Sequence, residues 1–102
     1  MEILSRATVQ ELDYDDPTNK SVGNTTTEIA AANTSRRYLS IVNDSNEVVY
    51  LGIGEDAVMN KGIRLNANGG AFEMLGLVLS FSAINGICTT GTKNVAVQEA
   101  SI

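Results

Sequence analysis

The chain contains no histidine among its 102 residues. Histidine is the usual general base, the central member of hydrolase triads and the commonest metal-binding side chain. Its absence argues against hydrolytic catalysis. We therefore expect a protein that is not an enzyme, with no catalytic residues, no cofactor and no metal site.

Cysteine and tryptophan are equally scarce, because Cys88 is the only cysteine and there is no tryptophan. A single cysteine cannot form an intrachain disulfide or a four-cysteine metal site, and without a histidine it lacks the partner that activates a nucleophile. We expect Cys88 to be a small buried hydrophobe. An aromatic content of 5% argues against a platform on which bases or sugars stack. A sandwich that binds a carbohydrate or another small molecule is therefore a disfavoured alternative.

The chain also has few basic residues and no long apolar run. Seven basic and twelve acidic side chains give a formal charge of -5, which repels the phosphate backbone and argues against nucleic-acid binding. The longest apolar run, Leu75 to Ala83, is far too short for a membrane span, and no lipidation motif is visible. The first residues do not form a secretory signal, so we expect maturation in a reducing cytoplasm.

The stretch Tyr38 to Leu51 has the clearest pattern of the chain. Two apolar runs rich in β-branched residues flank the polar insert Asn43 to Asn46. Leu39 and Ile41 share one face of the first run, and the second run alternates in the same way, as strands require. Because the insert consists of turn-forming residues, we predict a β-hairpin here.

The rest of the chain continues as short runs separated by turns. The run Leu77 to Ala83 is the most apolar, so we predict a central strand there, followed by a turn at Asn85-Gly86. Seven to nine strands at this spacing, in a chain long enough for one core, are typical of an all-β fold. We predict a single antiparallel β-sandwich or small, jelly-roll-like barrel at residues 25–102.

Residues 1–24 differ from this pattern, because they hold five of the twelve acidic side chains and a turn cluster around Pro17. We predict an extended N-terminal arm or edge strand; a first core strand or a short helix within Leu4 to Leu12 is the alternative. An arm that adds as a strand to another protein would suit a module that docks onto copies of itself or a larger assembly. The apolar arm residues expected to make such contacts are Ile3, Leu4, Val9 and Leu12.

Two patterns match ligand sites only in part. The run Gly52-Ile53-Gly54-Glu55-Asp56-Ala57 fits the dinucleotide-binding fingerprint, but no helix of usable length can follow, so we expect a turn or bulge. The acidic stretch Asp13 to Asn19 lacks the turn glycine and terminal glutamate of a helix-loop-helix calcium site, so we interpret it as a linker.

The segment Ala31 to Met74 resembles a pattern in small structural proteins of tailed bacteriophages, of the form aN-x-x-R-x-x-L-x-I-x-N, v-Y-L-G-x-G and G-I-x-L-x-x-N-G-G. Residues 93–99 are similar to the closing strand of those proteins, whereas the arm lies outside the resemblance. The linker at Met74 to Leu77 is shorter than in the family. The matching positions are Asn33, Arg36, Leu39, Ile41, Asn43, Val49, Tyr50, Leu51, Gly52, Gly54, Gly62, Ile63, Leu65, Asn68, Gly69 and Gly70.

This resemblance implies a head-decoration or cement protein on the capsid surface of the virion. Its implied partners are the major capsid protein and further copies of this chain, for instance in a trimer, with no small-molecule substrate. Arg36 and Arg37 could then pair with an acidic capsid surface; an ordinary edge-strand charge is the alternative. A neck, tail or fibre adaptor of the same virion is the second reading.

Overall fold

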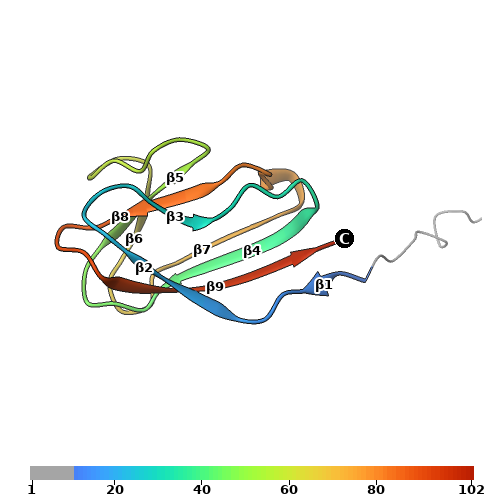
Figure 1. The fold of residues 1–102 in the computed structure, drawn as a ribbon, viewed down its shortest axis with the longest axis horizontal. Coiled ribbons are helices and arrows are strands. Elements are labelled where there is room, and N and C mark those ends of the chain that lie inside the picture. The colour runs from blue at the N-terminus through green and yellow to red at the C-terminus, as the bar shows by residue number, and fades with distance from the viewer. Residues whose placement is uncertain (1–10) are drawn as a thin grey trace, which may run out of the picture.

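Two antiparallel sheets pack face to face in the computed structural model, which describes residues 11–102 (Figure 1). One sheet has the strand order β1-β9-β4-β7, with β2 also paired to β9, and the other has the order β3-β8-β5-β6. The prediction of an all-β antiparallel sandwich is confirmed. The strands are β1 (Asp13–Tyr14), β2 (Thr18–Val22), β3 (Thr27–Ala30), β4 (Arg36–Asn43), β5 (Val49–Ile53), β6 (Ile63–Leu65), β7 (Ala71–Leu75), β8 (Ile84–Ile87) and β9 (Lys93–Ser101).

The predicted hairpin at Tyr38 to Leu51 is wrong. β4 pairs with β7 and β9 in one sheet, whereas β5 pairs with β6 and β8 in the other. The turn between them is a crossing from one sheet to the other. The predicted alternation is confirmed, since Leu39, Ile41 and Val49 are buried, but β4 and β5 belong to opposite sheets instead of lying side by side.

The buried side chain of Asn43 explains the crossing. Its amide nitrogen donates to the carbonyl oxygens of Glu47, Leu65 and Asn66 at 2.7–3.1 Å, and its Oδ1 accepts from the backbone and hydroxyl of Ser45. These bonds satisfy a polar group that would otherwise be costly to bury. They also direct the chain out of β4 and toward the second sheet.

The predicted central strand at Leu77 to Ala83 is also wrong. β7 ends at Leu75, the 3-10 helix η2 occupies Gly76–Val78, and an irregular loop leads to β8. Leu77 is fully exposed, although Leu79 packs against the core. The change of direction is made at Gly76, whose φ of 59° favours glycine.

The turn predicted at Asn85-Gly86 is a third error, because both residues lie inside β8. Gly86 is required there by the close approach of a side chain from β3, the neighbouring strand of the same sheet. A β-carbon at this position would stand 2.6 Å from Cδ1 of Ile29 on β3. The glycine therefore serves packing, as glycines inside strands often do.

We predict that Gly86→Ala lowers the free energy of unfolding by about 1–3 kcal/mol, because it overpacks the core against Ile29. Ile29→Val removes the colliding Cδ1 and by itself costs about 0.5–1.5 kcal/mol. Urea unfolding of both single variants and the double variant checks the contact. The double variant should lose clearly less stability than the sum of the two losses; strict additivity would contradict the account.

The N-terminal part of the described chain lies along β9. β1 and β2 both pair with it antiparallel, and Val22 at the end of β2 is fully buried. Leu12 precedes β1 and is half-buried. Ile3, Leu4 and Val9 lie outside the described residues. Gly52 to Ala57 forms the end of β5 and an irregular loop, as expected from the sequence.

Cys88 is buried, as predicted, with its Sγ 3.4 Å from the carbonyl oxygens of Val22 and Gly23. Nearby, the carboxylate of Glu47 accepts hydrogen bonds from the hydroxyl and backbone N–H of Thr90. These bonds stabilise the charged form and hold the pKa of Glu47 below its ordinary value.

The lowered pKa of Glu47 gives a stability contribution that is present above the ordinary carboxyl pKa and is lost as pH falls through the folded-state pKa. Thr90→Val removes the hydroxyl donor and should raise the titration midpoint of Glu47, followed by carboxyl-carbon NMR shifts. The stability difference between the wild type and Thr90→Val should shrink on acidification. An unchanged midpoint would show that the hydroxyl does not set the pKa.

Candidate protein-binding surface

A β-bulge in β4 turns Arg36 into the core. Arg36 pairs with Ser101 of β9 and Tyr38 pairs with Ala100, so Arg37 is an extra residue on β4. Such a bulge reverses the side on which the preceding side chain lies. Arg36 consequently shares the inward face with Leu39 and is fully buried.

The guanidinium of Arg36 finds a partner for each of its nitrogen atoms. Nε donates to Oε2 of Glu99 at 2.6 Å, which forms an ion pair. Nη1 donates to the carbonyl oxygens of Ser80 and Ser82 at 2.9 Å each, and Nη2 donates to that of Ala31 at 2.7 Å. Because a buried charge without partners is very costly, these contacts fix the segments that carry the acceptors.

Asn33 extends the same network. Its amide nitrogen donates to Oε2 of Glu99 and Oγ of Ser101, and its Oδ1 accepts from the backbone of Ser35. Its backbone N–H donates to the carbonyl oxygen of Phe81 at 2.9 Å. The loop at 31–35, the loop at 79–82 and the end of β9 are thus tied together at one end of the sandwich.

Exposed apolar side chains gather at this same end, which we call the apolar end. Leu77 is completely exposed, Val78 is 67% exposed and Phe81 is 45% exposed. They belong to a segment that we call the apolar loop, residues 76–81. Of the large hydrophobic side chains that are exposed within residues 11–102, only Val58 is elsewhere; the members of the apolar end are Tyr14, Leu75, Leu77, Val78, Phe81 and Ile102.

Strand register explains why Tyr14 and Leu75 lie at the same end. Tyr14 pairs with Ala100, Ala100 with Tyr38, and Tyr38 with Leu75, so all four stand in one row across the sheet. The rings of Tyr14 and Tyr38 are 6.0 Å apart between centroids. The hydroxyl of Tyr38 donates to Glu73 at 2.6 Å, and this bond raises the pKa of Tyr38.

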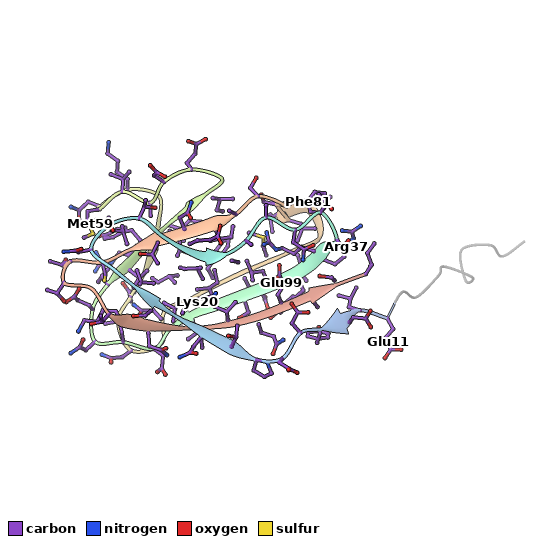
Figure 2. The ribbon with its side chains drawn as sticks, in the orientation of Figure 1. Glu11, Lys20, Arg37, Met59, Phe81 and Glu99 are labelled. Carbon is purple, nitrogen blue, oxygen red and sulfur yellow. The ribbon has the colours of Figure 1, made fainter. Side chains whose placement is uncertain are left out.

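The apolar loop is held in place although its side chains are exposed. Leu79 packs against the core, and its N–H donates to the carbonyl oxygen of Gly76. The guanidinium of Arg37 lies 5.4 Å from the ring centroid of Phe81, within cation–π range, and both side chains are labelled in Figure 2. The loop therefore presents its apolar side chains in a defined arrangement, which lowers the entropic cost of binding.

The two arginines singled out in the sequence have different surroundings. The expectation that Arg36 faces a partner needs correction, because its guanidinium is fully buried within the chain; nor does it lie at an edge, since β4 is a central strand. Arg37 is half-buried at the apolar end. The exposed residues of the apolar loop were missed, because their apolar run resembles a core strand.

Within residues 11–102, no three His, Cys, Asp or Glu side chains are grouped as they would be around a metal ion. In that range, none of the helices combines the length and apolarity needed for a membrane crossing. Comparison with known proteins gave no matching family model, no matching curated protein and no matching solved structure.

We predict that Arg36→Met lowers the free energy of unfolding by about 3 kcal/mol or more, because it leaves Glu99 without its cation and three carbonyl oxygens without their donor. Arg37→Met is the matched control and should cost less than about 1 kcal/mol, since it removes no buried ion pair and only the cation–π interaction and the hydrogen bonds to the carbonyl oxygens of Thr34 and Arg36. Denaturant unfolding compares the two. Equal losses would contradict the assigned role of Arg36.

Proposed function

We propose that this chain is a non-enzymatic structural protein of a tailed-bacteriophage virion, and that it decorates the outside of the head by docking its apolar end onto the capsid. The observation that carries the docking step is the gathering of exposed apolar side chains on a loop anchored by Arg36. Exposed apolar patches commonly mark protein-binding sites. The assignment to a virion rests on the sequence resemblance.

The positions that carry this resemblance support the framework of the fold more than a reactive site. Asn33 and Arg36 bind the loops at the apolar end, and Asn43 holds the crossing between the sheets. Gly62 has a φ of 80°, and a β-carbon there would stand 2.4 Å from the carbonyl oxygen of Leu51. These roles are compatible with a shared fold that serves adhesion.

A decorating protein does not need a deep pocket. Each copy can contribute a modest contact, because a symmetric shell repeats the site many times and a protein that touches several subunits gains effective concentration. An apolar loop beside a half-buried arginine fits such a contact, since interface centres are enriched in apolar side chains and arginine.

The alternative function is an adaptor in the neck, tail or fibre of the same virion, which could use the same surface. Copy number separates the two. Purified particles whose heads and tails are imaged and quantified separately should carry many copies on the head. A few copies at one vertex, or copies on the tail alone, would favour the adaptor.

Leu77→Asp and Val78→Asp are predicted to reduce the occupancy of particles by at least about tenfold, because a charge must then be desolvated at the contact. The melting temperature of the isolated protein should stay unchanged, since both side chains are exposed. Val58→Asp is the matched control, because Val58 is 47% exposed away from the apolar end. Equal binding of all three variants would rule out the apolar loop as the docking surface.

A further inference from the structure

The strand β7 offers a free edge. Among residues 11–102 it is hydrogen-bonded to β4 alone, and it is the last strand of its sheet (Figure 1). Its outward side chains Ala71, Glu73 and Leu75 are all exposed. An edge strand of this kind has unpaired backbone groups that can accept another strand.

A second β7 fits this edge poorly. Symmetric antiparallel pairing of two copies would place Glu73, the middle residue of the strand, opposite Glu73 of the other copy. Like charges directly opposite each other destabilise a pair of strands. The edge therefore calls for a strand that brings a positive charge to this position.

The sequence of the first ten residues has a side-chain pattern complementary to this edge. Leu4, Arg6 and Thr8 are spaced by two and would share one face of an extended segment. In an antiparallel register with Arg6 opposite Glu73, Leu4 stands opposite Leu75 and Thr8 opposite Ala71. The charges are complementary and the apolar residues meet, both of which stabilise cross-strand pairs.

We propose that residues 1–10 of one copy add to β7 of a second copy as an antiparallel strand, with Arg6 opposite Glu73 and Leu4 opposite Leu75. The inference goes beyond the docking of the apolar loop, because it uses the free edge of β7 and concerns contacts between copies of this chain.

The donor of this strand must be another molecule. The register leaves only two residues between Thr8 and Glu11, so these two Cα atoms can be at most about 11 Å apart. Glu11 precedes β1, at the opposite edge of the sheet, as Figure 2 shows. The added strand and β1 would be separated by four strand spacings, about 19 Å, and by further distance along the strands.

Such an exchange is head-to-tail, because each copy donates its N-terminal segment and accepts a segment at a different place, the edge of β7. Contacts of this type close into a ring when the rotation between copies permits it, and otherwise continue as a filament. The pairing would also cover the free edge of β7, which is otherwise a risk for aggregation.

A charge exchange tests the register. Arg6→Glu and Glu73→Arg should each weaken self-association by roughly three- to tenfold, measured by analytical ultracentrifugation over a concentration series. The double variant should recover most of the wild-type association. Lys20→Glu and Glu28→Arg make the same charge changes at exposed positions of β2 and β3 and should have little effect. Tyr38→Phe, which removes only the hydrogen bond to Glu73, should also leave association unchanged.

A pair of introduced cysteines tests whether the added strand comes from a second copy. A chain with Leu4→Cys, mixed with a longer tagged chain carrying Leu75→Cys, should form a mixed disulfide on mild oxidation, while Cys88 stays buried and does not compete. Replacing the second chain by one with Ala71→Cys should abolish the cross-link. A wild-type protein that stays monomeric, or a double charge variant that fails to recover, would overturn the proposal. A wild-type protein that self-associates but does not bind particles would instead count against the proposed function alone.

Discussion

The buried guanidinium of Arg36 is the constraint on which one end of this sandwich depends. A charge without solvent contact has to be matched by acceptors, and here these are Glu99 and the carbonyl oxygens of Ala31, Ser80 and Ser82. The acceptors come from β9 and two loops that are distant in sequence. The network therefore ties these two loops to β9, and the apolar loop is displayed on this support.

Much of the core could be predicted from the sequence, because burial in a strand follows a period of two residues. Leu39 and Ile41, which are predicted to share one face of a strand, are both buried, and so are Val49 and Leu51 of the second alternating run. Turn residues are informative in the same way, since Asn60 and Gly62, which lie between β5 and β6, both have positive φ. These features depend on nearest neighbours along the chain, where residue types carry direct information on backbone conformation.

Pairing between strands and the surroundings of Arg36 could not be predicted in the same way. A hairpin and a crossing between sheets need the same turn residues, and only the contacts of the Asn43 side chain with Leu65 and Asn66 select the crossing. Arg36 and Glu99 are 63 positions apart, and their contact requires a bulge that no local pattern indicates. The apolar loop was mistaken for a core strand because hydrophobicity alone does not separate a buried run from a displayed one.

The central claim is that Arg36 holds the apolar loop in a binding-ready arrangement, and hydrogen exchange tests it most directly. Arg36→Lys keeps the charge but offers one nitrogen in place of three. The backbone amides of Asn33 and Leu79 donate hydrogen bonds to the carbonyl oxygens of Phe81 and Gly76 at the apolar end. In Arg36→Lys these two amides should exchange at least about tenfold faster than in the wild type. Amides of β5 and β8 should change much less. Equal acceleration in all of these amides would contradict the account, because it would show that Arg36 supports only the overall stability of the fold.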